Sequence, residues 1–187
     1  MRPVRCFIAV FLDPALRPQV TTLQRHLARS GADVKWVEPE NLHFTLKFLG
    51  DVDESRVSEV SGRLRTCVQG ARAFDIGLGA PGAFPHVRDP RVIWVGVSRG
   101  KEPFVALASA VEEAMKTEGF RSEGRNVSPH LTVGRVRSAR NLDILVERLS
   151  SSPPLEGSMR VDSVRLMASD LTNRGPVYSE IAAIPLI

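Results

Sequence analysis

The spacing of apolar residues changes near the N-terminus, and the change marks the boundary between two elements. Arg5 to Leu12 is a continuous apolar run rich in Phe, Ile and Val, which is typical of a buried strand. Asp13 and Pro14 follow it and suit the first positions of a helix. A strand followed by a helix is therefore predicted, and Gly31 suits the end of a helix whose apolar face carries Leu16, Val20, Leu23 and Leu27.

The same reasoning predicts further strands and helices along the rest of the chain. The strands cover residues 34–37, 41–49, 74–78, 91–97, 130–136, 160–167 and 176–184. The helices carry apolar stripes at Val57, Val60, Leu64 and Cys67, at Phe104, Leu107, Val111 and Met115, and at Leu142, Leu145, Val146 and Leu149. The Gly- and Pro-rich stretch from Gly79 to Pro90 is predicted to end a strand, with a turn at 77–82. Many strands follow one another without a crossover helix, so the predicted fold class is α+β with mostly antiparallel sheets.

One short segment occurs twice in the chain. Asn41-Leu42-His43-Phe44-Thr45-Leu46 resembles Ser128-Pro129-His130-Leu131-Thr132-Val133, and each copy reads His-x-Thr-aliphatic on a predicted strand. Both copies follow a stretch rich in helices, which indicates two related lobes. We therefore expect a single two-lobed domain over residues 1–187. Each of its pseudo-symmetric lobes would hold a mostly antiparallel sheet with packed helices.

Each motif has a polar face and an apolar face, because side chains alternate between the two faces of a strand. His43 and Thr45 share the polar face of the first copy, and His130 and Thr132 share that of the second. If a pseudo-twofold axis relates the lobes, the polar faces meet in a central cleft and gather two imidazoles and two hydroxyls around one small volume. The opposite face of the two strands is expected to pack in the core through Leu42, Phe44, Leu46, Phe48, Leu131 and Val133.

Two histidines in one cleft suit phosphodiester chemistry near neutral pH. Imidazole has an ordinary pKa of about 6.5, so one ring can accept a proton from attacking water while the other donates a proton to the leaving oxygen. The hydroxyls of Thr45 and Thr132 can donate hydrogen bonds to the non-bridging phosphate oxygens. No spacing of His, Cys, Asp and Glu in the chain forms a metal site, so we expect metal-free chemistry without a cofactor. His26 and His86 lack a Thr partner and are interpreted as structural or solvent-facing.

Composition places the chain among ordinary globular proteins. Its 187 residues are 43% hydrophobic and 25% charged, which suits one domain with its own core and excludes disordered, collagen-like and coiled-coil classes. The two cysteines, Cys6 and Cys67, fit no zinc or redox spacing. No apolar run is long enough to cross a membrane. We therefore expect a cytoplasmic monomer with no membrane partner.

The net charge of +4 favours an anionic partner, and the type of base is more informative than the total. Arg supplies 21 of the 25 basic residues, and its planar guanidinium matches phosphate oxygens. The segment around the second motif has one acid, Glu123, and five arginines: Arg121, Arg125, Arg135, Arg137 and Arg140. This segment can bind phosphate or an RNA backbone, or it can be a solvated face. Strict alternation places Arg135 on the face opposite the motif's polar residues, so it reaches the site only through a bulge or a twist.

These motifs resemble those of the 2H phosphoesterase superfamily, whose name refers to two His-x-Thr-x signatures. Within it, the chain is similar to the bacterial and archaeal RNA 2′,3′-cyclic phosphodiesterases, historically called 2′-5′ RNA ligases. The family often has an aromatic residue just before the second motif, where this chain has Asn126-Val127-Ser128, so no base-stacking residue is predicted there. The resemblance covers nearly the whole chain and is carried by Arg5-Cys6-Phe7-Ile8-Ala9, Trp36-Val37, Asn41-Leu42-His43-Phe44-Thr45-Leu46-Lys47-Phe48-Leu49-Gly50, Phe84-Pro85, Pro90-Arg91-Val92-Ile93-Trp94, Pro129-His130-Leu131-Thr132-Val133-Gly134-Arg135 and Gly175-Pro176-Val177-Tyr178.

The resemblance implies a two-lobed fold with the histidines in a central cleft. It also implies hydrolysis of a terminal 2′,3′-cyclic phosphate, on RNA ends or nucleosides, to a 2′-phosphate. In this reaction His43 donates a proton to the leaving 3′ oxygen, and His130 accepts a proton from water. Thr45 and Thr132 hold the phosphate, and Arg135 is a further candidate for phosphate binding.

Two other functions are compatible with the same residues. The chain can be a ligase that joins RNA ends carrying a 2′,3′-cyclic phosphate and a 5′-hydroxyl, because one site serves both directions of a reaction. It can also be a non-catalytic RNA-end-binding module that uses its arginines. The two intact histidines argue against the second function, since binding alone needs no acid–base pair.

Overall fold

The structure is a computed structural model that describes residues 3–122, 124, 127–173 and 175–187. Its α-helices are α1 (Arg17–Ala28), α2 (Val57–Val68), α3 (Lys101–Thr117) and α4 (Leu142–Ser151), and its 3₁₀ helices are η1 (Pro14–Leu16), η2 (Pro39–Asn41) and η3 (Glu54–Arg56). The strands are β1 (Pro3–Phe11), β2 (Val34–Trp36), β3 (His43–Asp53), β4 (Phe74–His86), β5 (Asp89–Arg99), β6 (Leu131–Val136), β7 (Ser158–Val161), β8 (Ser163–Thr172) and β9 (Gly175–Pro185). Apart from β4 and the region 160–167, these elements follow the predicted order.

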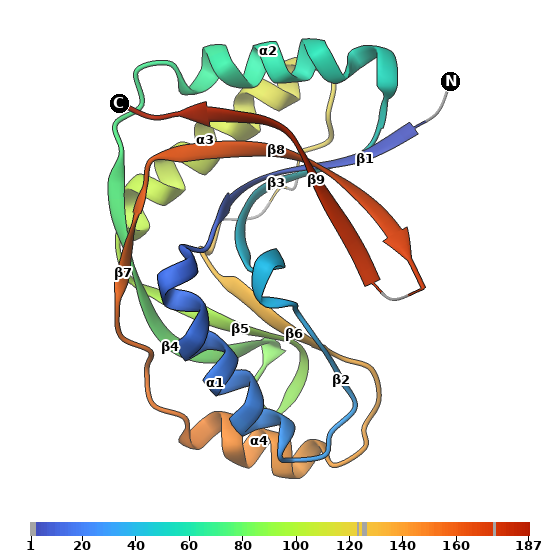
Figure 1. Cartoon of the computed structure of the whole chain (residues 1–187), viewed down its shortest axis with the longest axis vertical. Coiled ribbons are helices and arrows are strands. Elements are labelled where there is room, and N and C mark those ends of the chain that lie inside the picture. Colours follow the sequence, from blue (N-terminus) through green and yellow to red (C-terminus); the bar gives the residue numbers. More distant parts are fainter. Residues whose placement is uncertain (1–2, 123, 125–126, 174) are drawn as a thin grey trace.

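The strands form one strongly curved sheet (Figure 1). Their order is β7-β4-β5-β6-β3-β1-β8-β9, and β2 pairs with β6. All pairings within the described ranges are antiparallel. The predicted α+β class with antiparallel strands is therefore confirmed, and the strands of the two halves are joined in one continuous sheet.

The helices pack in two pairs at opposite ends of the sheet (Figure 1). One pair is α2 and α3, and the other is α1 and α4. Each helix turns its apolar stripe inward, as Val20 and Leu27 of α1 and Phe104 and Val111 of α3 show by being fully buried. The core lies between these helices and one face of the sheet, which leaves the other face available for a site. None of the helices in the described residues combines the length and the apolar character needed to cross a membrane.

The predicted turn at 77–82 was wrong, because these residues belong to a strand and the chain turns later, at Val87 and Arg88. The Gly- and Pro-rich stretch supplies most of β4, which pairs with β5 through irregular steps around Pro81. Proline has no N–H to donate to a neighbouring strand, and an irregular step does not require this hydrogen bond as a regular ladder does. Gly82 is required for a different reason. A Cβ at Gly82 would lie 2.3 Å from the ring of Trp94 on β5, so only glycine lets the indole rest on the backbone there.

The strand predicted at 160–167 is divided in two. It breaks at Asp162, and its two parts join distant places in the sheet. β7 pairs with β4 at one edge, whereas β8 pairs with β1 and β9 near the other edge. The apolar alternation shifts by one residue across Asp162 and Ser163, but this shift does not say which strand each half pairs with.

Candidate active site

The two His-x-Thr motifs lie on neighbouring strands. Phe44 of β3 is paired with Leu131 of β6 in antiparallel register. Both side chains are fully buried, and the ring of Phe44 packs against Phe104 of α3 with the ring centroids 6.0 Å apart. These two residues therefore face the helices, and the residues on either side of them face the open side of the sheet.

The flanking residues form the candidate site. Continuing the register sets His43 across from Thr132 and Thr45 across from His130, since opposed residues of an antiparallel pair point to the same face. The pair of strands thus has a local twofold axis between the two motifs. The predicted gathering of two imidazoles and two hydroxyls is present, and it arises from adjacent strands of a single sheet.

Aromatic rings surround His43. The centroids of Phe7, Phe11 and Tyr178 lie 4.9, 5.4 and 5.6 Å from the centroid of the imidazole. Phe7 and Phe11 come from β1 and Tyr178 from β9, and together with Ala9 and Met167 they form a small apolar cluster on the site face. His43 is therefore held in a mainly apolar environment by strands on the β1 side of β3.

Different strands support His130. The ring of Phe84, on β4, meets the imidazole edge to face with the centroids 5.0 Å apart, and Trp94, on β5, lies 6.5 Å away. The two histidines are therefore fixed by aromatic residues from opposite halves of the sheet, although they share one local symmetry axis.

Both imidazoles use the same ring nitrogen to bind the backbone. Nδ1 of His43 lies 2.6 Å from the carbonyl oxygen of Asn41, and Nδ1 of His130 lies 2.6 Å from that of Ser128. A carbonyl oxygen only accepts hydrogen bonds, so each Nδ1 carries a hydrogen and donates it. Nε2 is then the nitrogen of each ring that can exchange a proton with a ligand.

The pKa of His43 is lowered from its ordinary value of 6.5. Burial is the main cause, and the positive charges of Arg135 and His130 lower the pKa further. The hydrogen bond to Asn41 acts in the opposite direction. These effects favour a neutral His43 in the free protein, and an anion bound between the imidazoles would favour its charged form.

The two threonine hydroxyls are available for a ligand. Thr45 pairs with Ala9 of β1 and Thr132 pairs with Trp94 of β5, and both side chains are half-buried. Within the described residues neither hydroxyl has a hydrogen-bond partner. Because nothing else occupies these donors, a phosphate bound between the motifs would find both of them free.

A bulge brings Arg135 to the site face. Relative to β5, β6 has one extra residue at Val133, because Thr132 pairs with Trp94 whereas Arg135 pairs with Val92. Trp94 and Val92 are two residues apart and share a face, so the bulge puts Arg135 on the same face as Thr132. The charge of Arg135 accordingly acts on both His43 and Tyr178.

A second bulge explains one incorrect prediction. Relative to β1, β3 has an extra residue at Leu46, which changes the alternation after it. Lys47 therefore points to the core, where it is fully buried and its Nζ donates to Oε2 of Glu112 at 2.6 Å and to the carbonyl of Arg121 at 3.0 Å. Phe48 was expected in the core, but it is 53% exposed and faces the site side.

The rest of the arginine-rich segment is spread over different positions. The side chain of Arg121 is exposed, and Arg137 and Arg140 are exposed beyond the end of β6. Arg125 lies outside the described residues, as do Glu123 and Asn126. Arg135 is therefore the described member of this group that the fold brings close to the imidazoles.

Sequence reasoning assigned no role to the aromatic residues that surround the imidazoles. A signal was present in β1, where Phe7, Ala9 and Phe11 alternate with Ile8 and Val10, so both faces are apolar. Such a strand is covered on both sides, which is consistent with helices on one face and a packed site on the other. As for metal binding, the described part of the chain brings no three His, Cys, Asp or Glu side chains together in a group that could hold an ion.

A curved antiparallel α+β sheet with two His-x-Thr motifs on adjacent strands defines a phosphoesterase of the two-histidine class. The chain also matches a family model that agrees with this class. This is the model of the 2′-5′ RNA ligase superfamily, which matches residues 12–173, and the chain belongs to this family.

Several relatives are similar over nearly their whole length. The RNA 2′,3′-cyclic phosphodiesterase of Methanothermobacter thermautotrophicus is 44% identical over 184 residues, which cover 98% of this chain and 99% of the relative. The RNA 2′,3′-cyclic phosphodiesterase of Aeropyrum pernix is 38% identical over 164 residues, covering 87% and 92%. Among solved structures, E. coli LigT complexed with 3′-AMP has a TM-score of 0.79 at 24% identity, covering 98% of both chains. This last likeness shows the same fold.

Proposed function

We propose that this protein opens terminal 2′,3′-cyclic phosphates of RNA or nucleosides by metal-independent hydrolysis to a 2′-phosphate. The observation that carries the proposal is the pair of half-buried imidazoles on adjacent strands, each with Nδ1 bonded to a backbone carbonyl and Nε2 left for chemistry. The names of the relatives, which are called RNA 2′,3′-cyclic phosphodiesterases, support the same substrate class.

The two histidines take opposite roles in this reaction. Nε2 of neutral His130 accepts a proton from the attacking water as the new P–O bond forms. Nε2 of protonated His43 donates a proton to the ribose 3′ oxygen as the P–O3′ bond breaks. The phosphate stays on the 2′ oxygen, and the two rings exchange protonation states over one turnover.

The substrate itself prepares His43 for the acid role. In the free protein, burial and the positive charges of Arg135 and His130 lower the pKa of His43. The cyclic phosphate is an anion, and its binding beside the imidazole raises that pKa because an opposite charge stabilises the protonated ring. His43 therefore becomes a competent acid when substrate is bound.

The remaining polar groups bind the phosphate. Thr45 and Thr132 donate their free hydroxyls to the two non-bridging oxygens, where negative charge increases in the transition state. Arg135 shares their face and adds a positive charge near the same oxygens. None of these three groups needs to transfer a proton.

Ligation is the second candidate and uses the same groups. A 5′-hydroxyl takes the place of water, and His130 accepts its proton in the same way. The name of the family favours keeping this activity as an alternative. Water is present at far higher concentration than RNA ends, so hydrolysis is the favoured direction.

We further propose that the protein acts as a cytoplasmic monomer without a cofactor. Both histidines and both threonines come from one chain, so a single copy holds a complete site. A second subunit would add nothing that the proposed reaction needs.

The proposal is tested by incubating the protein with a nucleoside 2′,3′-cyclic phosphate in EDTA and separating the product isomers. We expect the 2′-phosphate, and we expect His43→Ala and His130→Ala each to lower kcat by about 10²–10⁴-fold. His86→Ala is the matched control, because His86 is exposed at the end of β4. Activity that disappears with EDTA and returns with a divalent ion would exclude the metal-free mechanism. Full activity of either alanine variant would remove that histidine from the mechanism.

A further inference from the structure

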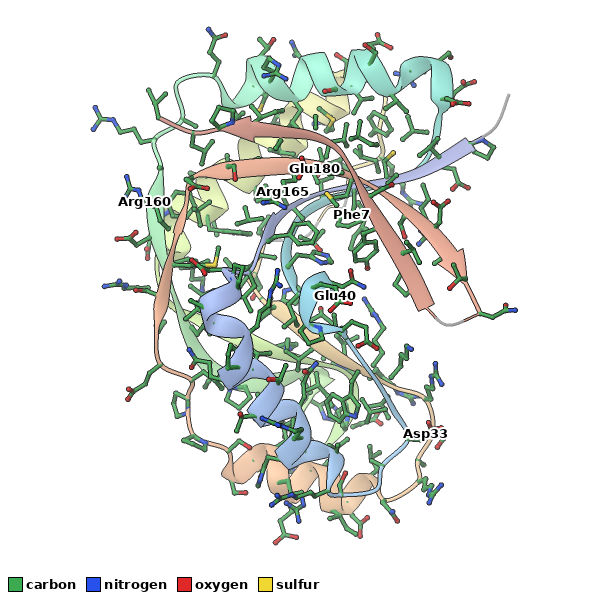
Figure 2. The ribbon with its side chains drawn as sticks, viewed as in Figure 1. Phe7, Asp33, Glu40, Arg160, Arg165 and Glu180 are labelled. Atoms are coloured by element: carbon green, nitrogen blue, oxygen red, sulfur yellow. The ribbon has the colours of Figure 1, made fainter. Side chains whose placement is uncertain are left out.

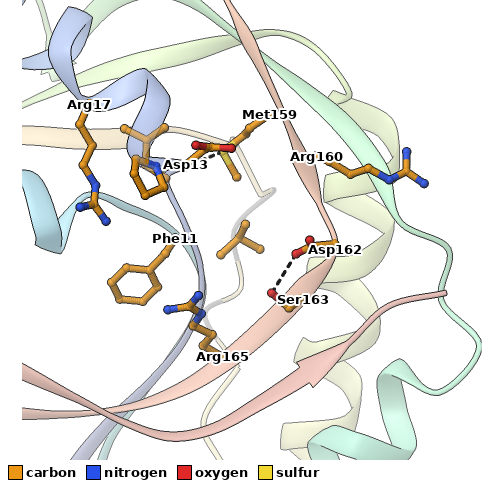
Figure 3. A pocket seen from close by; sticks show the side chains of 11 residues that line it. Phe11, Asp13, Arg17, Met159, Arg160, Asp162, Ser163 and Arg165 are labelled. Carbon is orange, nitrogen blue, oxygen red and sulfur yellow. Dashed lines mark hydrogen bonds between the residues drawn. The ribbon is translucent and has the colours of Figure 1, made fainter.

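A groove lies beside the site at the end of β1, with a volume of about 210 Å³ (Figure 3). It is bounded by the last residues of β1, by the start of α1, and by β7 and the start of β8. Three arginines line it: Arg17, Arg160 and Arg165. The proposed reaction uses none of these side chains.

The groove and the site share one aromatic wall. The ring of Phe11 lines the groove, and its centroid lies 5.4 Å from that of His43. On the groove side, Cζ of Arg165 lies over the same ring at 5.3 Å from its centroid. A ligand whose reacting end lies at His43 can therefore extend over Phe11 into the groove.

The groove offers cationic donors that the fold does not fully use. The side chain of Arg17 makes no ion pair or hydrogen bond with the other described residues, and its Nε is buried without a partner. Such a donor is costly unless a ligand accepts its hydrogen bond. Arg165 is paired with Glu180 of β9 at 3.4 Å, and both side chains are partly exposed (Figure 2). A ligand can still reach the remaining guanidinium donors of Arg165.

The two acids of the groove each accept one local hydrogen bond. Asp13 accepts from the backbone N–H of Ala15. Asp162 accepts from the hydroxyl of Ser163 (Figure 3). Among the lining residues three guanidinium groups outnumber these two carboxylates, so the groove has a net positive charge, which suits an anion.

The proposed chemistry determines which part of the substrate comes to this side. In an in-line displacement the attacking and leaving oxygens lie on opposite sides of phosphorus. Water is at His130, so the leaving 3′ oxygen and its ribose lie at His43. The 5′ position of that ribose carries the rest of an RNA strand, beginning with a phosphodiester. That phosphodiester must leave the site on the side of His43, where the groove opens.

We propose that the groove binds the phosphodiester on the 5′ side of the terminal nucleotide, with Arg17 and Arg165 as its donors and Phe11 as the wall that leads to it. The inference rests on the proposed function and narrows its substrates, which were RNA ends or nucleosides, to RNA ends. The preferred substrate is an oligonucleotide with a 2′,3′-cyclic phosphate, not a single nucleoside.

The test compares a nucleoside 2′,3′-cyclic phosphate with a dinucleotide that ends in the same group. We expect the wild type to have the higher kcat/KM for the dinucleotide, and Arg17→Gln and Arg165→Gln each to lower the dinucleotide-to-nucleoside ratio by about 5- to 30-fold. The slope of log kcat/KM against log salt for the dinucleotide should become shallower by about 0.7 in each variant, as for one lost contact to a single strand. Arg160→Gln is the matched control, because Arg160 has the same charge at the rim, pairs with Asp75 at 3.7 Å and points away from Phe11 (Figure 3).

Affinities provide a readout that does not depend on turnover. Calorimetry with a nucleoside 2′-phosphate and a dinucleotide 2′-phosphate should show the same preference and the same loss in the two variants. A wild type that opens neither cyclic phosphate would refute the proposed function. The affinities alone would then test whether the groove binds the 5′ phosphodiester. Equal values for the two ligands, or a ratio unchanged in both Arg17→Gln and Arg165→Gln, would refute the groove inference and leave the hydrolysis intact.

Discussion

Replacing either motif threonine by valine removes one hydroxyl from the site and almost nothing else. Thr45 and Thr132 lie on strands, and valine has nearly the same shape and an equal preference for extended backbone. Neither hydroxyl has a partner within the described residues, so its removal leaves no protein group unsatisfied. The loss in Thr45→Val and Thr132→Val therefore reports the bond to the substrate.

The expected loss follows from the position of these hydroxyls. Each would donate one hydrogen bond to a charged phosphate oxygen in a half-buried site, which contributes about 1.5–3 kcal/mol. The loss of one such bond therefore lowers kcat/KM by roughly 10- to 150-fold. The local twofold relation between β3 and β6 makes the two positions equivalent, so the two variants should be affected to a similar extent.

The assay measures kcat/KM for a nucleoside 2′,3′-cyclic phosphate across the pH range, together with the affinity for the 2′-phosphate product. The pH profile should keep its two limbs, because valine replaces a group that does not titrate. Thermal unfolding serves as the control for the fold. Two valine variants that turn over the substrate and bind the product as the wild type does would refute phosphate binding by these hydroxyls.

Three further predictions concern charge. The alkaline limb of kcat/KM should lie at lower pH than that of kcat, because the pKa of His43 is lowered by burial, Arg135 and His130 in the free enzyme and is raised by bound phosphate; coincident limbs would contradict this reasoning. Arg135→Gln removes one of those cations, so the alkaline limb of kcat/KM should move to higher pH, and a movement to lower pH would exclude the assigned electrostatic effect. Glu112→Gln leaves the ammonium of fully buried Lys47 without its carboxylate and should decrease the free energy of unfolding by about 2–4 kcal/mol, somewhat less than for a fully buried pair because Glu112 is 21% exposed. Urea unfolding measures this loss, Lys47→Met should cost less because no buried charge remains, and a Glu112→Gln protein as stable as the wild type would disprove the argument.

The sequence determined the elements and the chemistry of the site. The period of the apolar residues located the helices and most strands, because local burial repeats every 3.6 residues in a helix and every two in a strand. The repeated His-x-Thr motif was enough to single out two imidazoles and two hydroxyls as the polar groups of the candidate site. Both results depend on residues that are close together in the chain.

The tertiary structure determined which strands become neighbours. The pairing of Phe44 with Leu131 brings together segments from distant parts of the chain, and the resulting site lies on a single curved sheet. The same curvature divides the strand predicted at 160–167, since its two halves pair at opposite parts of the sheet. Pairing partners are chosen by contacts across the whole molecule, and the pattern within one segment does not contain them.

Two bulges show the limit of the sequence most clearly. The extra residue at Leu46 sends Lys47 into the core and Phe48 out of it, and the extra residue at Val133 brings Arg135 onto the site face. A single inserted residue reverses the face of everything beyond it, because side chains alternate with a period of two. Whether an insertion occurs depends on the register of the neighbouring strand. The alternation rule therefore predicted the faces of both motifs correctly and failed a few residues beyond them. There the pairing with the neighbouring strand determines which face each side chain takes.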